Sequence, residues 1–202
     1  MSQAPGVPQG KPVGAELGWR LRRTRYLYRS DWFDLRQDEL HLPNGEPATF
    51  TYVEHPGFVS ILPLTDQGQI LLIRSYRYTV DAWCWELPAG GVGNKPELDL
   101  AGVARSELLE ETGHVVTGRL EHVTRYHNAI GNSRTPADVF FATGVRPAGE
   151  QRLDATEQIE VHPLPAAAVL AMAQGGQIED GASALAILLC AERIEAALRG
   201  AL

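Results

Sequence analysis

Apolar and polar positions alternate at short, strand-like spacing from about residue 17 to residue 85. Residues that favour tight turns interrupt this stretch at three places, namely Asn44-Gly45, Pro56-Gly57 and Asp66-Gln67-Gly68. The first of them indicates a hairpin, and the third joins the apolar runs 59–62 and 70–73. The pattern therefore predicts an N-terminal antiparallel sheet over roughly 17–54, leading into a mixed core sheet.

Helical spacing begins after a Gly-rich turn at 88–93. The apolar residues that define this helix are Leu100, Val103, Ala104, Leu108 and Leu109. We expect about four turns, closed by Gly113 beyond the last helical residue. Strands are then predicted near 119–126, 137–145 and 158–162, and helices near 165–173 and 181–198, with Asp180 and Ser183 as candidate caps of the last helix. This order of elements is that of a mixed α/β protein.

Composition narrows the class of protein. The 202 residues are 44% hydrophobic and 21% charged, as in compact globular proteins. A net charge of −7 disfavours a nucleic-acid partner, and no apolar stretch is long enough to predict a membrane span. The start of the chain lacks the apolar core of a signal peptide, and the two cysteines, Cys84 and Cys190, are too few for a disulfide framework. These features fit a cytoplasmic protein.

Residues 1–14 are rich in Pro and Gly, and we expect them to be flexible. Residues 15–55 would then form the N-terminal sheet, and 56–202 the main domain.

Three glutamates carry the candidate chemistry. Glu107, Glu110 and Glu111 lie at i, i+3 and i+4 of the predicted helix, so their side chains emerge on one face within about 6 Å of each other. By spacing alone, a solvated acidic face is the simpler interpretation. The Gly-rich turn before the helix changes this, because main-chain groups there approach a metal or a phosphate without interference from a side chain. Hard oxygen ligands suit Mg²⁺ or Mn²⁺, which support diphosphate hydrolysis.

The segment 87–91 together with 106–113 resembles the Nudix box, G-x5-E-x7-R-E-U-x-E-E-x-G-U. The resemblance implies an α/β/α sandwich with a mixed sheet. It also implies a Mg²⁺ site, in which Mn²⁺ can substitute, with the four ligand residues Ala89, Glu107, Glu110 and Glu111. The chain departs from the box by one extra residue before the helix, by Ser106 in place of its Arg, and by His114 in place of an aliphatic residue. Arg105 is the candidate to replace the missing Arg by pairing with Glu97.

The resemblance extends over about 17–195 and points to the ADP-ribose pyrophosphatase and nucleoside-diphosphate-sugar hydrolase branch. It is carried by the segments 53–57, 73–78, 85–90 and 175–180. Membership of that branch implies a homodimer that exchanges its N-terminal sheets, and a small nucleotide diphosphate as substrate. The products would be a nucleoside monophosphate and a sugar phosphate.

Substrate contacts are expected from two regions. We expect Arg74 and Arg77 to share one face of a strand and grip the diphosphate, with Tyr76 facing the other way; edge-strand ion pairs are the alternative. Main-chain groups of Gly90 and Gly91 would also contact the substrate.

The loop after the box, through Asn128 and Ser133, would border the sugar. Ala129 stands where ADP-ribose enzymes of this branch often carry Pro, so nucleotide sugars remain equal candidates.

The general base is expected to be Glu157 or, failing that, Glu110; a solvated loop carboxylate is the alternative for Glu157. A second class of function is a Nudix-fold metabolite-binding module that has lost catalysis. The missing box Arg supports that class, whereas the three intact glutamates oppose it. The sequence as a whole favours the enzyme.

Overall fold

The computed structural model describes residues 11–199, which fall into two compact units. The first comprises the chain up to His55 together with Ala129–Thr135, and the second comprises Pro56–Asn128 together with the chain from Pro136 onward. Each unit is described by itself.

The first unit is a four-stranded sheet in the order β1-β2-β3-β10. Its strands are β1 (Arg20–Arg29), β2 (Asp34–His41), β3 (Pro47–Glu54) and β10 (Ser133–Arg134). The first three are antiparallel, and Gly45 (φ 86°) closes the expected hairpin between β2 and β3. The short strand β10 runs parallel to β3, so the sheet is mixed rather than purely antiparallel.

The end of the segment that is expected to be flexible contains helical residues. Pro12–Glu16 form a short helix, α1, begun by a proline in its first turn, where the missing N–H costs nothing. The rest of the expected flexible segment, 1–10, lies outside the described residues.

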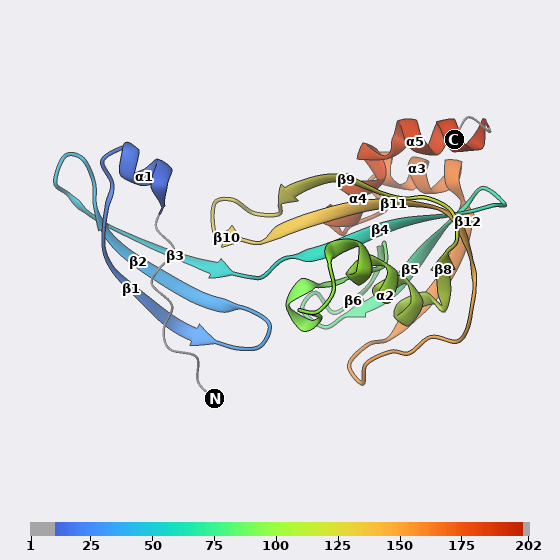
Figure 1. Cartoon of the computed structure of the whole chain (residues 1–202), viewed down its shortest axis with the longest axis horizontal. Helices are drawn as coiled ribbons and strands as arrows, with labels where there is room; N and C mark the ends of the chain where they lie inside the picture. Colours follow the sequence, from blue (N-terminus) through green and yellow to red (C-terminus); the bar gives the residue numbers. More distant parts are fainter. Residues whose placement is uncertain (1–10, 200–202) are drawn as a thin grey trace. The chain divides into compact units, whose positions relative to one another are not determined.

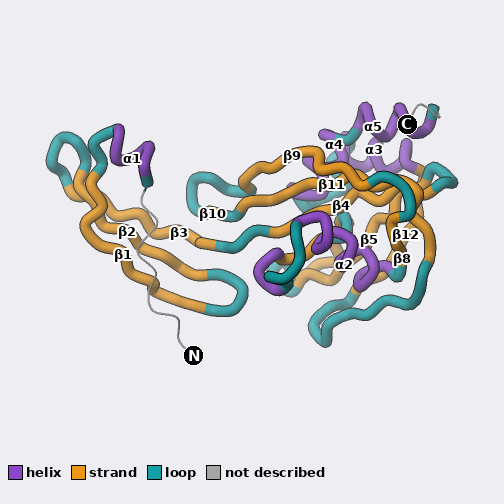
Figure 2. The backbone as a smooth tube through the Cα atoms, in the orientation of Figure 1, coloured by secondary structure: helices purple, strands orange, loops and turns teal. Residues whose placement is uncertain are grey.

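The second unit is built on an eight-stranded sheet with the central path β12-β5-β4-β11-β8 (Figure 2). Its strands are β4 (Phe58–Thr65), β5 (Gln69–Arg77), β6 (Ala82–Glu86), β7 (Ala89–Gly91), β8 (His114–Val116), β9 (Leu120–His127), β11 (Pro136–Pro147) and β12 (Ile159–Pro165). The parallel pair β4 and β11 lies at its centre, which explains why both strands are almost continuously apolar and buried.

Helices cover both faces of this sheet. They are η1 (Val92–Asn94), α2 (Leu100–Thr112), α3 (Ala166–Gln174), α4 (Gly181–Leu189) and α5 (Ala191–Leu198). Figure 1 shows α3, α4 and α5 gathered together and α2 separate from them. One apolar cluster joins Leu72 to Ile187 on the face under α4, and a second joins Leu71 to Leu108 on the face under α2. This is the expected α/β/α sandwich with a mixed sheet, so the predicted fold class is confirmed.

Two local expectations were wrong. The Gly-rich segment 89–91 is not a plain turn: it forms strand β7, paired antiparallel with β4. The single helix expected over 181–198 is two helices that meet at Cys190, which is fully buried. No Gly or Pro lies at this break, so the sequence carries no local signal for it; Ile194 of α5 packs into the core.

No helix between residues 11 and 199 is long and apolar enough to cross a membrane.

Candidate active site

Helix α2 begins and ends where the sequence predicts. The Asp99 side chain accepts a hydrogen bond from the Gly102 N–H at 2.7 Å, which caps the N-terminus. Gly113 follows the helix in the left-handed conformation (φ 70°) and donates its N–H to the Leu109 carbonyl. A side chain at Gly113 would also meet the Gly149 carbonyl oxygen at 2.4 Å. The helix is therefore fixed at both ends, and its acidic face is held at a defined position.

Glu111 is the most buried of the three carboxylates, with 4% of its surface exposed. Its Oε2 accepts a hydrogen bond from the Ala89 N–H at 2.9 Å, which ties α2 to strand β7. Burial raises the pKa of Glu111 well above its ordinary value, and the nearby charges of Glu107 and Glu157 raise it further. A cation beside this carboxylate would relieve both effects.

Glu107 packs against the main chain of strand β7. A Cβ placed on Gly90 would lie 2.0 Å from Glu107 Cδ, so only glycine leaves room for the carboxylate here. Burial raises the pKa of Glu107, although a hydrogen bond from Lys95 opposes the shift. Neighbouring Gly91 is less confined, because its nearest contact would be Asn94 Nδ2 at 3.8 Å.

A lysine that the sequence analysis did not single out lies among these carboxylates. Lys95 Nζ is 3.0 Å from Glu107 Oε1, 2.7 Å from Glu110 Oε2 and 3.2 Å from Ser106 Oγ. Ser106 Oγ in turn donates to Glu110 Oε1 at 2.6 Å. Burial acts to raise the pKa of Glu110, but the hydrogen bonds from Lys95 and Ser106 outweigh it and hold that pKa below its ordinary value.

The expected brace between Arg105 and Glu97 is not formed. Arg105 is exposed and donates instead to the Val116 carbonyl at 3.3 Å, and within residues 11–199 it makes no ion pair with Glu97. The physical reason is helical geometry, since position 105 is turned about 100° from position 106. The positive charge beside Glu107 and Glu110 is instead that of Lys95, in the loop before the helix.

The loop 148–158 is fastened to the C-terminal end of α2. The Arg152 N–H donates to the Glu110 carbonyl at 2.8 Å, and Gln151 Nε2 donates to the Glu111 carbonyl at 2.6 Å. Glu157 Oε2 accepts the Asp154 N–H at 2.8 Å, which closes a turn at the far end of the loop. The charge of Glu157 raises the pKa of both Glu107 and Glu111, so this candidate base lies near enough for its charge to act on the two carboxylates.

Arg74 and Arg77 lie on opposite faces of β5, contrary to expectation. Side chains alternate along a strand, and residues three apart therefore point in opposite directions. Arg77 forms a two-pronged ion pair with the buried Glu86, and Glu111 and Asp180 further raise its pKa. Arg77 lies on the face of β5 that Leu71 shares, and Leu71 belongs to the apolar cluster with Leu108 of α2.

Arg74 lies on the other face, where its guanidinium stacks on two tryptophans. The guanidinium carbon is 5.9 Å from the ring centroid of Trp83 and 5.8 Å from that of Trp85. Tyr76 shares this face with Arg74, since its ring contacts Trp83. The expectation that Tyr76 faces away from Arg74 was therefore also wrong.

Asn128 and Ser133, the two expected sugar contacts, belong to different units. Asn128 is exposed just after β9 in the second unit. Ser133 lies in β10 of the first unit, where it pairs with Val53 and donates its N–H to the Ala129 carbonyl at 2.8 Å. A strand of only two residues has no recognisable pattern, so this pairing could not be predicted from the sequence.

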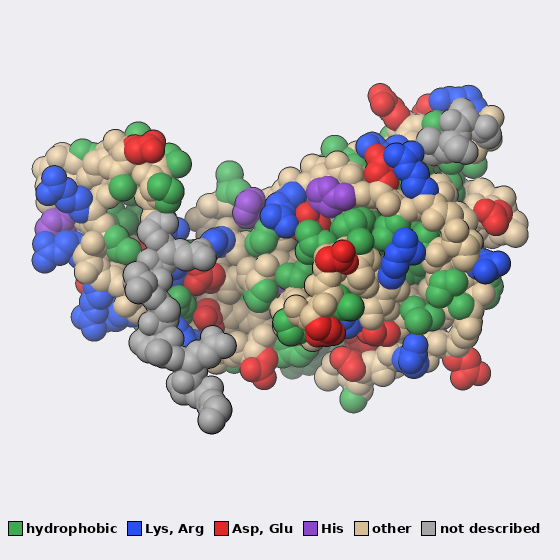
Figure 3. Space-filling model, in the orientation of Figure 1, with side chains coloured by type: hydrophobic (Ala, Val, Ile, Leu, Met, Phe, Trp, Pro, Cys, Tyr) green, Lys and Arg blue, Asp and Glu red, His purple; other side chains and the backbone are tan. Residues whose placement is uncertain are grey.

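The residues suit a divalent cation chemically. Carboxylate oxygens are hard ligands that such a cation prefers, and burial raises the pKa values of two of these carboxyl groups, Glu107 and Glu111. They lie beside the main chain of β7, where a side chain at Gly90 would displace Glu107. As placed, no three or more His, Cys, Asp or Glu side chains within residues 11–199 are arranged to hold a metal ion. Two of the three carboxylates bind Lys95 instead. A metal ion therefore fits this donor set only if Lys95 moves. Figure 3 shows acidic side chains over and beside α2.

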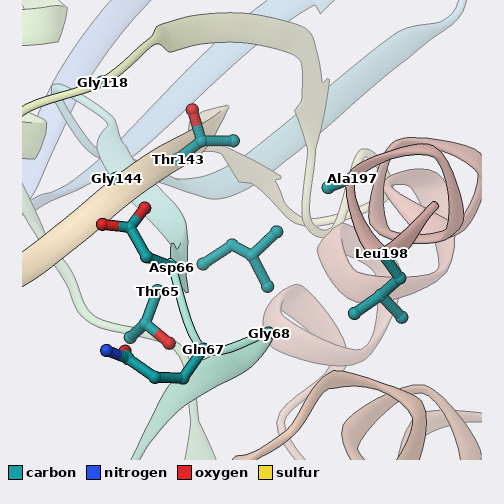
Figure 4. A pocket seen from close by; sticks show the side chains of 10 residues that line it. Thr65, Asp66, Gln67, Gly68, Gly118, Thr143, Gly144, Ala197 and Leu198 are labelled. Carbon is teal, nitrogen blue, oxygen red and sulfur yellow. The ribbon is translucent and has the colours of Figure 1, made fainter. Parts of the chain in front are cut away.

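A separate cavity of about 510 Å³ lies in the second unit near the turn between β4 and β5 (Figure 4). Its lining residues are Leu64, Thr65, Asp66, Gln67, Gly68, Gly118, Thr143, Gly144, Ala197 and Leu198. None of the candidate site residues contributes to it.

Comparison with known protein families decides the class of this site. The NUDIX domain matches residues 54–182, and the nucleoside diphosphate sugar hydrolase N-terminal domain matches residues 19–53. The chain belongs to the Nudix family. The Nudix resemblance and the expectation of a hydrolase acting on pyrophosphate bonds are thereby confirmed.

Several individual proteins are similar over most of the chain. An ADP-ribose pyrophosphatase of Bacillus subtilis (strain 168) is 31% identical over 164 residues, which are 80% of this chain and 86% of that protein. An ADP-ribose pyrophosphatase of Mycobacterium tuberculosis (strain ATCC 25618 / H37Rv) is 36% identical over 140 residues, covering 67% of this chain and 64% of that protein. A crystal structure described as an ADP compounds hydrolase superposes with a TM-score of 0.75 at 18% identity, covering 91% of this chain and 97% of that one. This last likeness shows the fold.

Proposed function

We propose that this Nudix hydrolase uses Mg²⁺, replaceable by Mn²⁺, to split the diphosphate of ADP-ribose or of a nucleoside-diphosphate sugar. The observation that carries the proposal is the pair of contacts between α2 and β7. Glu111 accepts a hydrogen bond from the Ala89 N–H and Glu107 packs on Gly90, so one buried and one partly buried carboxylate are held against the main chain of β7. Two relatives named ADP-ribose pyrophosphatase support the substrate class. The products are a nucleoside monophosphate and a sugar phosphate.

The proposed metal ligands are the carboxylates of Glu107, Glu110 and Glu111 and the main-chain oxygen of Ala89. A divalent cation at such a site neutralises phosphate charge and acidifies a bound water. Placing the ligands on one helix face fixes the site relative to the sheet, and the burial of Glu111 anchors one end of the ligand set.

Glu157 is the proposed general base. Its charge acts on Glu107 and Glu111, and its loop is fastened to α2 at Glu110 and Glu111, which supports a role in accepting a proton from the attacking water. Arg77 is proposed to hold the diphosphate. Its side chain is 48% exposed while Glu86 fixes two of its nitrogens, which leaves a positioned positive charge on the α2 face of the sheet.

Recognition of the leaving sugar is proposed for the loop through Asn128 and Ser133, and main-chain groups of Gly90 and Gly91 are proposed to contact the substrate. ADP-ribose and nucleotide sugars remain joint candidates, because the curated relatives favour the first and the N-terminal domain match favours the second.

A homodimer is proposed to form through the first unit. Several large apolar side chains of that unit are exposed, namely Leu17, Trp19, Leu21, Tyr26, Leu27, Tyr28, Trp32, Phe33 and Phe50. So many exposed apolar residues in one small unit indicate a protein interface. Light scattering at micromolar concentration should give twice the mass of the chain, and a fully active monomer would reject the dimer. The cytoplasm is the proposed location, since Cys84 and Cys190 are both free.

The decisive experiment is a substrate panel with the full chain. ADP-ribose, ADP-glucose, GDP-mannose, UDP-glucose and nucleoside triphosphates are incubated with Mg²⁺, with Mn²⁺ or with a chelator, and released phosphomonoester is measured. With a divalent cation we expect cleavage of ADP-ribose or of the nucleotide sugars, and with chelator we expect no cleavage of any compound. Glu107→Gln and Glu111→Gln should each lower turnover at least about 100-fold with the fold retained. Tight binding of ADP-ribose without turnover would instead support a metabolite-binding module.

A further inference from the structure

Lys95 makes three hydrogen bonds, all to side chains of α2. The distances from Nζ are 2.7 Å to Glu110, 3.0 Å to Glu107 and 3.2 Å to Ser106, and 18% of the Lys95 side chain is exposed. An ammonium donates three hydrogen bonds, and here all three are used. A positive charge thus sits between two of the three carboxylates that are the proposed metal ligands.

Two departures from the family motif lie close to Lys95 in the loop and helix that it joins. The extra residue before the helix lengthens the loop that carries Lys95, which lies between η1 and α2. Ser106, in place of the box arginine, is short and itself bonds to Lys95 and Glu110. An arginine at 106 would bring a second cation into the space where the ammonium now lies. The longer loop and the shorter side chain therefore act together.

We propose that Lys95 is the resident counter-ion of the acidic helix, and that a divalent cation binds only as the Lys95 ammonium withdraws to solvent. This inference rests on the proposed function, because it takes Glu107 and Glu110 as metal ligands. An ammonium and a divalent cation that share the same carboxylate oxygens repel each other at a part-buried site, so binding of one disfavours binding of the other. The four-carbon stem of lysine lets its ammonium leave without movement of the main chain.

The exchange has two consequences. Without metal, the ammonium offsets repulsion among three carboxylates on one helix face, which would otherwise destabilise α2. With metal, the cost of displacing Lys95 lowers the apparent affinity of the site, as any competing bound state does. Lys95 is thus a positioning residue of the metal-free enzyme and a competitor of its metal.

The sequence offers an unusually direct test, since Lys11 and Lys95 are its only lysines. The unaltered protein is treated briefly with an acetylating reagent, with chelator or with saturating Mn²⁺, and acetylation of each lysine is measured by peptide mass spectrometry. Lys11 is exposed and should react alike in both conditions. Lys95 should be protected with chelator and react several-fold faster with Mn²⁺. Continued protection of Lys95 in protein saturated with Mn²⁺ would overturn the inference.

A second measurement uses Mn²⁺ affinity, read from the paramagnetic resonance signal of free Mn²⁺ without any substrate. Lys95→Met should bind Mn²⁺ about three- to tenfold more tightly than the unaltered protein, because the competing cation is gone. Lys11→Met, the matched control, should bind as the unaltered protein does.

The two ideas fail differently. If the unaltered protein binds no Mn²⁺, the proposed metal site is wrong. If it binds Mn²⁺ but Lys95→Met binds equally or more weakly, only the counter-ion role is wrong. The acetylation test needs no substitution, so poor folding of Lys95→Met would not leave the inference untested.

Discussion

The Glu107 carboxylate occupies the space that a side chain at Gly90 would need: a Cβ there would lie 2.0 Å from Glu107 Cδ and 2.1 Å from Oε1. Those atoms are the end of a flexible side chain, so an added methyl group would push the carboxylate aside while the main chain stays. The contact therefore determines the direction of the Glu107 side chain, whereas the stability of the fold depends little on it.

Gly90→Ala should lower turnover of the preferred substrate about 100-fold or more, because misplacing a reacting group by about 1 Å has effects of that size. The melting temperature should fall by only a few degrees. Gly91→Ala is the matched control, since its nearest contact would be 3.8 Å away, and it should retain most activity. Equal activity of the two variants would show that the Gly90 contact does not position a catalytic group.

Local signals were sufficient to predict helix α2 and the fold class. Gly113 and the spacing of Leu100 and Leu108 are properties of one short segment, and that segment folds as they indicate. Lys95 was not predicted, because its partners lie 11, 12 and 15 residues away in the sequence. No local pattern predicts where the side chain of a loop lysine will lie.

Glu157→Gln should reduce kcat at least about 100-fold, with little change in the affinity for Mn²⁺. Gln keeps the volume and can still accept the hydrogen bond from the Asp154 N–H, so the turn that holds this residue should survive. Steady-state kinetics and Mn²⁺ titration separate the two effects. Near-normal kcat would move the role of base to Glu110.

Arg77→Ala should weaken turnover of every diphosphate substrate alike, because an arginine that binds bridging phosphates recognises charge and not the sugar. Arg74→Ala is the control on the opposite face of β5, where the guanidinium stacks on Trp83 and Trp85; it should leave kcat close to normal. Measurement of kcat/KM on ADP-ribose and on two nucleotide sugars tests both. Loss of activity in Arg74→Ala but not in Arg77→Ala would contradict the assignment.

The error over Arg74 has a plain physical origin. Residues three apart are neighbours on a helix, but they point to opposite faces of a strand. The sequence already predicted a strand at 70–73, and strict alternation continued to Arg77 would have separated the two arginines. What alternation could not predict is which of them faces α2, because that depends on which face of the sheet the helix covers.

The sheet of the first unit offers a test of stability. Asp38 is 1% exposed and accepts hydrogen bonds from Arg36, Thr24 and Tyr52. Burial acts to raise the pKa of Asp38, but these hydrogen bonds outweigh burial and hold the pKa below the ordinary value of 3.8. The stabilisation is therefore complete above pH 3.8 and is lost as the pH falls through the lower pKa of the folded state.

Asp38→Asn should destabilise the first unit by about 3 kcal/mol at neutral pH, because it leaves the buried Arg36 guanidinium with Glu54, at 3.3 Å, as its remaining ionic partner. Glu39→Gln, at the next position of β2, is the matched control. The Glu39 side chain is 37% exposed and pairs with Arg25 at the surface, so its loss should cost about 1 kcal/mol or less.

Denaturant unfolding of both variants and the unaltered protein, followed from pH 7 to pH 2.5, measures these differences. The gap between Asp38→Asn and the unaltered protein should narrow only below about pH 4, since protonation removes the same charge that the substitution removes. A gap that narrows already between pH 7 and pH 5 would mean that a histidine, and not Asp38, governs the acid sensitivity of this sheet.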